Sequence, residues 1–341
     1  IWLEYGRKVL EMTPAEVSAE ILKELVRQAS AQYKGIKDVV ITVPAYFNDK
    51  QVSDTLLAGQ LAGLNVLNIL REPTAATLVY EVESIKSDEI RLLAYDLGGG
   101  TFDTSLVRIT KPTDVSDLES LYGRIEGETT YSMLYTVLDT DGDSRLGGDD
   151  IDYELYKRLE RKFLEPKGLS PDLVQKQDRE KLILRMEKIK KSGPGNYEIS
   201  VDLKLRNGTK IKEKVFITME DFVEATSVVY NKTKAKVKAV LERAGSYKID
   251  GIVLVGGSTK SEIIKGFLRR DFPGVHINDA LNPDEAVALG AAVKAKESKF
   301  GDKSIEVFDV LPLSIGVLSE GHVKPIIKKN QRVPYSSGHM F

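Results

Sequence analysis

The stretch AYDLGGGTFDTSLV, which runs from Ala94 to Val107, places three consecutive glycines between two apolar segments. Three adjacent glycines weaken any strand or helix, so we expect two strands within 92–109 that flank a turn. Backbone N–H groups in a tight glycine turn can point together at one anion and form a nest for phosphate. The residues alone leave two interpretations open: a phosphate-binding turn, or a glycine-rich hairpin without a ligand.

Polar side chains beside these glycines fit a phosphate site. Asp96 ends its strand and can orient Mg²⁺ through waters, because magnesium gives up its hydration reluctantly. Thr101 offers a hydroxyl to a terminal phosphate, and the backbone surface comes from Gly98, Gly99 and Gly100. Such a site promotes phosphoryl transfer mainly by positioning and charge neutralisation.

A second glycine turn, GGST at residues 256–259, follows the apolar segment 251–255 and begins an expected helix. Its amide groups and the helix dipole favour an anion. The turn matches neither the P-loop pattern nor the dinucleotide fingerprint, because their spacings are absent. We expect the two turns to lie on two opposed halves of the chain and to hold a nucleotide in a cleft between them.

The order strand, helix, strand, helix occurs twice along the chain. We expect it first at 38–44, 50–62, 66–70 and from Pro73, and again at 251–257, 259–270, 275–277 and from Asn282. We interpret the two units as related α/β halves that face each other; chance similarity is the alternative, because strand–helix units are common. This order favours an α/β fold with a largely parallel or mixed sheet covered by helices.

Other segments carry clear local signals. A capping box at 13–16 begins a helix with an apolar stripe that we expect to pack on the core: Val17, Ile21, Leu25 and Ala29. A further helix is expected over 170–191. Two alternating segments, 197–205 and 210–217, flank Asn207-Gly208 and predict a hairpin. The polar segment 110–136 predicts a long, irregular surface insertion.

Composition narrows the function classes. The chain has 341 residues, 42% of them hydrophobic, which suits roughly two globular domains. A net charge of −2 gives no basic excess for nucleic acid or an anionic membrane, and no apolar run approaches the roughly twenty residues that a membrane helix needs. The chain has no cysteine, and its three histidines lie outside the glycine motifs, which disfavours thiolate catalysis, serine–histidine triads and histidine metal clusters.

The acidic run DTDGD at 139–143 has a spacing that suggests a calcium loop. An EF-hand requires glycine at its sixth position, where this chain has Ser144, and no helix pair obviously flanks the run. We therefore favour a segment without calcium and keep the calcium loop as the alternative.

Motifs along nearly the whole chain resemble those of the DnaK-type, seventy-kilodalton heat-shock chaperones. In order, they are VPAYFND at 43–49, EPTAA at 72–76, DLGGGTFD at 96–103, LGGD at 146–149, VGGST at 255–259 and NPDEAVA at 282–288. The resemblance implies an actin-like (ribonuclease H-like) α/β ATPase domain of two lobes, incomplete at the N-terminus and followed by the start of a β-rich domain.

The resemblance also implies a domain plan. Residues 1–88 would be the remainder of ATPase lobe I, 89–281 lobe II, and 282–299 a helix that returns to lobe I. Residues 300–312 would be the interdomain linker, and 313–341 the start of the peptide-binding β domain. The family's first phosphate loop, of the Asp-Gly-Thr-Thr type, and its early catalytic lysine have no counterpart. We therefore expect an incomplete sequence that hydrolyses ATP poorly as it stands.

Roles for individual residues follow from the same resemblance. Asp96 would organise Mg²⁺ through water, and Glu72 would help to position the attacking water or a nearby cation. Asp103 would support a site for a monovalent ion, with K⁺ as the candidate. The β- and γ-phosphates would be held by Gly98, Gly99, Gly100 and Thr101. The rest of the nucleotide would be held by Gly256, Gly257, Ser258, Glu187, Lys190, Lys191, Lys260 and Asp284.

Departures from the family pattern concern adenine and the linker. Lys260 stands where the family has an arginine, and lysine cannot stack flat on adenine as a guanidinium does. Gly193-Pro194 occupies the region of a serine near adenine, and Glu306 interrupts the apolar linker segment. Adenine recognition is therefore expected to be weakened or altered.

Taken with the residues, the resemblance implies an ATP-hydrolysing chaperone whose nucleotide state controls peptide binding through the linker. ATP or ADP and Mg²⁺ would be its cofactors. Its partners would be extended client peptides, J-domain cochaperones and nucleotide-exchange factors, by default in the cytoplasm, with neither nucleic acid nor membrane. A non-catalytic nucleotide-binding scaffold or exchange partner of another chaperone is the alternative. A sugar or acetate kinase of the same superfold is disfavoured by the β-domain start.

Overall fold

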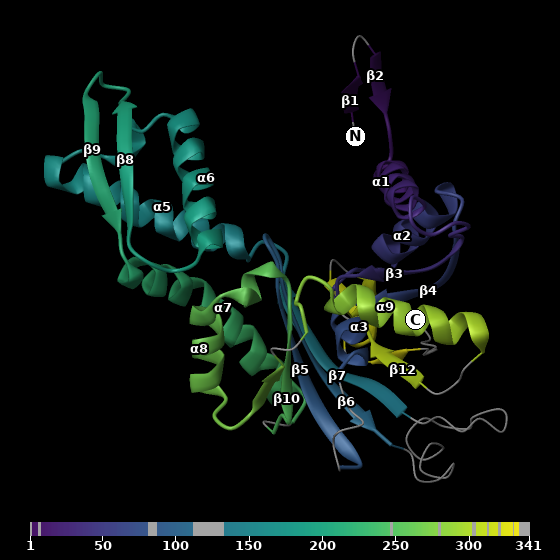
Figure 1. The fold of residues 1–341 in the computed structure, drawn as a ribbon. Helices are drawn as coiled ribbons and strands as arrows, with labels where there is room; N and C mark the ends of the chain where they lie inside the picture. The colour runs from purple at the N-terminus through teal and green to yellow at the C-terminus, as the bar shows by residue number, and fades with distance from the viewer. Residues whose placement is uncertain are drawn as a thin grey trace.

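A long mixed sheet runs through the centre of the molecule, with helices packed on both of its faces (Figure 1). The structure is a computed structural model. It describes residues 2–5, 8–80, 87–111, 133–245, 248–278, 281–301, 305–311, 314–319, 322–329 and 331–333.

The central sheet has seven strands in the order β11-β10-β5-β6-β7-β12-β15. Its middle is an antiparallel meander of β5, β6 and β7. β10 and then β11 are added in parallel beside β5, and β12 lies parallel to β7 on the other side. The strands are β5 (Glu89–Leu97), β6 (Phe102–Thr110), β7 (Met133–Asp143), β10 (Gly251–Val255), β11 (His276–Asn278), β12 (Ile305–Val310) and β15 (Arg332–Val333).

β5 directs alternate side chains into two separate cores. Leu93 and Tyr95 pack in the core that contains the buried faces of α5 (Gly148–Leu164), α7 (Met219–Arg243) and α8 (Glu262–Asp271). Ile90 and Leu92 pack in the core that contains α3 (Glu72–Leu78) and the first residue of α9 (Ala286–Phe300). Helices on both faces of the sheet explain why β10, with the sequence GIVLV, is apolar and buried along its whole length.

The predicted hairpin after residue 196 is confirmed. β8 (Tyr197–Lys204) and β9 (Lys210–Ile217) pair antiparallel, and Gly208 in their turn has a φ of 86°. Their buried residues alternate with exposed ones along each strand, so one face packs on α5 and α6 (Lys176–Ser192).

The first strand–helix–strand unit folds like its later counterpart. β3 (Asp38–Val43) and β4 (Asn65–Arg71) are parallel and are connected through α2 (Asp49–Leu61). β10 and β11 are likewise parallel and are connected through α8. A separate hairpin, β1 (Trp2–Tyr5) and β2 (Lys8–Glu11), precedes the first unit.

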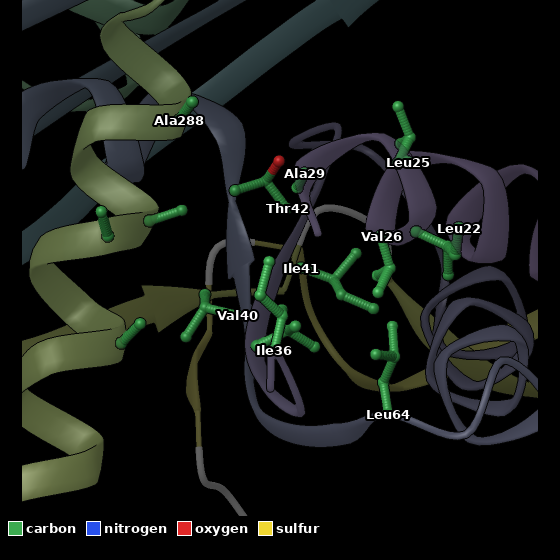
Figure 2. A pocket seen from close by; sticks show the side chains of 14 residues that line it. Leu22, Leu25, Val26, Ala29, Ile36, Val40, Ile41, Thr42, Leu64 and Ala288 are labelled. Carbon is green, nitrogen blue, oxygen red and sulfur yellow. The ribbon is translucent and has the colours of Figure 1, made fainter. Parts of the chain in front are cut away.

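The apolar stripe of α1 (Pro14–Ala29) is largely exposed, so our expectation that it packs on the core was wrong. Ile21 and Leu25 keep 58% and 55% of their surface exposed, whereas Ala15 and Ala19 are the buried residues of this helix. Leu25 instead helps to line an open apolar groove of about 490 Å³ between α1, β3 and α9 (Figure 2). Helical periodicity identifies an apolar face, but it does not say what covers that face.

Two predicted boundaries were also wrong. The segment 110–136 is regular at both ends, because β6 extends to Thr110 and β7 begins at Met133; residues 112–132 lie outside the described part of the chain. The helix expected over 170–191 is divided into a 3₁₀ turn at Pro171–Leu173 and α6. The Leu173 carbonyl accepts a hydrogen bond from the Arg206 N–H at 2.9 Å, which ties this segment to the hairpin instead of to the helix.

The segment expected to be an extended linker forms a strand of the central sheet. β12 pairs with β7 from Ile305↔Met133 to Phe308↔Thr136. Beyond it, β13 (Ile315–Ser319) and β14 (His322–Ile327) form a hairpin, as the β-rich texture of this region predicts. The domain limits drawn from the resemblance remain predictions.

Candidate functional site

The two glycine turns lie next to each other at one edge of the central sheet. β5 and β10 are parallel neighbours, and Val255 pairs with Asp96 at their carboxyl ends (Figure 1). Our expectation that the turns lie on opposed halves was therefore wrong. Parallel pairing brings the loops that follow two strands to the same edge, which is where α/β folds bind ligands.

Direct contacts join these two turns. The Ser258 hydroxyl donates a hydrogen bond to the Gly98 carbonyl at 2.9 Å. Gly256 has a φ of 81°, and a Cβ at this position would lie 2.5 Å from the Leu97 carbonyl oxygen. Position 256 therefore requires glycine both for its left-handed backbone and for close packing.

A third glycine turn, at Gly147 and Gly148, completes the cluster. The N–H groups of Gly148 and Asp149 donate to the carbonyls of Gly98 and Gly99, at 2.9 and 2.7 Å. A Cβ on Gly147 would lie 2.3 Å from the Gly99 carbonyl oxygen. The LGGD motif was visible in the sequence, but only the structure shows that it supports the first glycine turn at the N-terminus of α5.

The glycines of the first turn are not required by the protein's own packing. Cβ atoms built on Gly98, Gly99 and Gly100 would meet Thr101 and Asp149 at 3.5 to 3.8 Å, which is ordinary van der Waals contact. None of the three has a left-handed φ. At Gly147 and Gly256, by contrast, an added Cβ would clash with backbone atoms. This difference favours a bound ligand as the reason why residues 98–100 are glycines.

Three carboxyl groups gather beside this turn. Burial raises the pKa of Asp96 to about 7, and the charge of Glu72 raises it further. Burial, followed by the charges of Asp96 and Glu72, raises the pKa of Asp103 to about 8. Burial also raises the pKa of Glu72. The cluster holds more negative charge than its surroundings neutralise, which is the condition that a bound cation relieves.

The donor set suits a cation that keeps much of its hydration. Asp103 Oδ1 is buried without a hydrogen-bond partner. Among the described residues, no three acidic or histidine side chains are placed to hold an ion by themselves. Mg²⁺ commonly takes one or two carboxylates and completes its shell with waters and phosphate, so these residues fit it.

A comparison with protein families decides the identity. The family model described as Hsp70 protein matches residues 1–116 and 130–341. The chain belongs to the Hsp70 family. Its fold is therefore the actin-like ATPase fold, which agrees with the mixed α/β sheet and the later β-strands described above. Members of this family are nucleotide-binding chaperones that act with client peptides and cochaperones.

The residues expected to hold adenine and ribose in this Hsp70 chain fall into three groups. Lys190 lies close to the glycine turns, because its ammonium donates to the Gly148 carbonyl and to Asp152, both at 2.7 Å. Glu187 and Lys191 pair with each other on the outer side of α6. The Lys260 ammonium pairs with Asp284, whose Oδ1 would lie 3.3 Å from a Cβ on Gly257.

Sequence reasoning missed two residues that border the carboxyl cluster. Burial and the charges of nearby carboxylates, led by Asp103 and Glu72, raise the pKa of Tyr46 to about 12. Arg71 immediately precedes Glu72, and its charge opposes the upward shift of the Asp103 pKa. The VPAYFND motif contained the signal for Tyr46, whereas nothing in the sequence singled out Arg71.

The acidic run at 139–143 belongs to β7, and cationic side chains pair with two of its three aspartates. Asp139 is buried and accepts two hydrogen bonds from Arg243, at 2.8 and 3.0 Å. Arg243 and Lys236 also pair with Asp141. Pairing of these two carboxylates with cations along a strand favours the segment without calcium.

The carboxyl cluster predicts a pH-dependent stability in metal-free buffer. Asp96 and Asp103 hold protons in the folded chain up to pH values near 7 and 8, whereas the unfolded chain releases them near pH 4. The folded state therefore binds more protons, and its stability falls as pH rises through this window, by about 1.4 kcal/mol per pH unit for each group. Urea unfolding at pH 5.5 to 8.5 measures this slope; we expect Asp103→Asn or added Mg²⁺ to flatten it. A flat profile for the unaltered, metal-free chain would contradict the prediction.

No helix within the described ranges has both the length and the apolar character needed to span a membrane.

Proposed function

We propose that this Hsp70 chain binds ATP with Mg²⁺ and hydrolyses it, and that the nucleotide state controls peptide binding through the segment that forms β12. One observation carries the proposal. A glycine turn whose added Cβ atoms would make only ordinary contacts lies beside three carboxyl groups, and none of these forms an ion pair with a described residue. Bound Mg²⁺ would supply the positive charge that both the phosphates and these carboxylates require.

The position of each residue suggests its part. Asp96, the next-to-last residue of β5, would hold waters of the metal. Thr101, exposed at the other end of the turn, would donate a hydrogen bond from its hydroxyl to the terminal phosphate. Glu72 is the first residue of α3 and would orient the attacking water. Asp103, with its unpartnered oxygen, would support a monovalent ion such as K⁺. Together these groups would position the reactants and neutralise charge, as phosphoryl transfer requires.

Replacing Thr101 tests hydrolysis. We expect Thr101→Ala to lower ATP turnover roughly a hundredfold, the usual effect of losing one hydrogen-bond donor to a developing charge. Turnover of radiolabelled ATP by the chain measures the effect. Thr209→Ala, which alters an exposed threonine in the β8–β9 turn, is the matched control and should leave turnover unchanged. Equal turnover in Thr101→Ala and the unaltered chain would reject the assignment.

Replacing Gly99 tests whether a ligand is the reason for the bare turn. We expect Gly99→Ala to change the free energy of unfolding by less than about 1 kcal/mol, because the added Cβ makes only ordinary contacts. The same methyl group should obstruct phosphate and weaken ATP binding at least roughly tenfold, by about 1.4 kcal/mol. Urea unfolding and calorimetric titration with ATP measure the two effects. Unaltered ATP affinity in a folded variant would contradict this interpretation.

A nucleotide-binding scaffold or exchange partner without turnover is the second candidate. Two cations expected to face the base are already engaged within the protein, Lys260 with Asp284 and Lys190 with Asp152. Binding of ATP without turnover would favour this candidate, whereas turnover that Thr101→Ala abolishes would favour hydrolysis. In either case extended client peptides, J-domain cochaperones and nucleotide-exchange factors are the partners that we propose.

A further inference from the structure

Arg71 lies at the junction between the first half of the chain and the strand β12. It ends β4 and is the N-cap residue of α3, so the next residue in the chain is Glu72. Its side chain is only 14% exposed. A guanidinium this deep in the fold needs several hydrogen-bond acceptors to remain charged.

The acceptors of Arg71 come from two separate places. Nη1 donates to the carbonyls of Pro44, Ala45 and Phe47, at 3.2, 2.8 and 2.9 Å. Nε donates to Asp309 Oδ2 at 3.2 Å. The three carbonyls belong to the loop that follows β3. Asp309 belongs to β12 and lies 238 residues after Arg71 in the chain.

Asp309 is held as firmly as its partner. Its Oδ1 accepts a hydrogen bond from the Val310 N–H at 2.8 Å, so both carboxylate oxygens are engaged. Val310 is 3% exposed and packs in the same core as Ala75, Ala76 and Ala286. The Arg71–Asp309 pair therefore exists only while β12 lies in register beside β7.

The N-terminal end of β12 makes a separate contact with α9. The Ile305 N–H donates to Glu297 Oε1 at 3.1 Å, and Glu297 pairs with Lys294 within α9. This contact holds the start of the strand, but it lies on α9 and not on the segment that carries Glu72. Of these two contacts, the one made by Arg71 is directly connected through the backbone to Glu72 of the carboxyl cluster.

We propose that Arg71 is a positioning residue that couples the seating of β12 to the placement of Glu72 and of the loop 44–47. This inference deepens the proposed function, because it names the residue through which the linker strand regulates the site. With β12 in the sheet, Asp309 fixes the guanidinium, and the guanidinium fixes both the loop and the start of α3. When Asp309 leaves, neutral carbonyls are the only hydrogen-bond acceptors that Arg71 keeps among the described residues, and a partly buried charge that has lost its ion-pair partner destabilises its surroundings.

Hydrogen exchange on the full chain without nucleotide tests the coupling directly. Asp309→Asn alters only the β12 side, yet we expect amide exchange at residues 46–48 and 72–76 to quicken roughly tenfold, as local opening becomes easier. Arg71→Ala, which also removes the three carbonyl hydrogen bonds, should produce at least the same change. The double variant should be no worse than Arg71→Ala alone, because that substitution already removes the ion pair with Asp309. Asp202→Asn, which alters an exposed ion pair with Lys212 on the β8–β9 hairpin, is the matched control.

Kinetics separates positioning from a merely structural role. Arg71 contacts no part of the glycine turns, so Arg71→Ala and Asp309→Asn should lower single-turnover hydrolysis while ATP affinity stays unchanged. Arg71→Lys, which keeps the charge, should restore most of the exchange protection and of the rate. Arg91→Ala, at the start of β5, is the arginine control and should alter neither measurement.

Three outcomes would overturn the inference. In the first, Asp309→Asn would quicken amide exchange in β12 alone, or in no segment. In the second, the effects of the two single variants on amide exchange would add in the double variant. In the third, ATP affinity would fall together with the hydrolysis rate. If the unaltered chain does not turn over ATP, the proposed function fails, and the exchange measurements still decide whether Arg71 couples β12 to residues 72–76.

Discussion

Gly290→Ala is expected to lower the free energy of unfolding of the chain by at least about 3 kcal/mol. A Cβ at this position of α9 would lie 1.8 Å from the Ala75 carbonyl oxygen and 2.4 Å from its carbonyl carbon. Both contacts are with backbone, so no side-chain rotation relieves them, and α9 and α3 must separate. The core around Ala75, Ala76 and Ala286 would open as a result, which accounts for the size of the loss.

The control for Gly290 is another helical glycine. Gly266 lies in α8, and a Cβ there would meet no atom within 4 Å. Gly266→Ala should stabilise the chain by up to about 1 kcal/mol through its higher helix propensity. Urea unfolding of the two variants under the same conditions measures the difference. Similar stabilities would show that the close crossing of α3 and α9 is not needed for the fold.

Gly256→Ala is expected to damage both the fold and the site. Its φ of 81° strains any other residue, and the new Cβ would approach the Leu97 carbonyl oxygen at 2.5 Å and Asp96 Oδ1 at 2.8 Å. The methyl group would therefore push apart the two strand ends that carry the glycine turns. We expect a loss of at least about 3 kcal/mol in stability, together with loss of ATP binding.

Gly63 provides a control with nearly the same φ. Its φ is 78°, but a Cβ there would meet nothing within 4 Å. Gly63→Ala should cost only the backbone strain, about 1 kcal/mol, and should leave ATP binding intact. Urea unfolding and ATP titration of both variants separate backbone strain from the contact with β5. Equal losses in the two variants would mean that the contact contributes nothing.

Local structure was largely predictable because it depends on neighbouring residues. The capping box at 13–16 and the Asn207-Gly208 turn both form as their residues require. The glycine-rich motifs and the carboxyl residues near them were also visible in the chain. By contrast, the Val17–Ala29 stripe of α1 is correct in its helical spacing and wrong in its burial, because burial depends on segments elsewhere.

The placement of the site residues could not be read from their spacing along the chain. Asp96 and Gly256 are neighbours because β5 and β10 pair in parallel, a relation that neither segment specifies alone. The support of the first turn by Gly147 and Gly148 has the same origin.

Residue types and short motifs were enough to establish an α/β chain of the Hsp70 type with glycine turns and carboxyl residues next to them in the sequence, because they set local backbone geometry and chemistry. The folded chain was needed to show that both turns share one sheet edge, that residues 305–310 form a strand, and that Arg71 meets Asp309. Those relations join segments up to 238 residues apart, and they follow from strand pairing and packing, not from local preference.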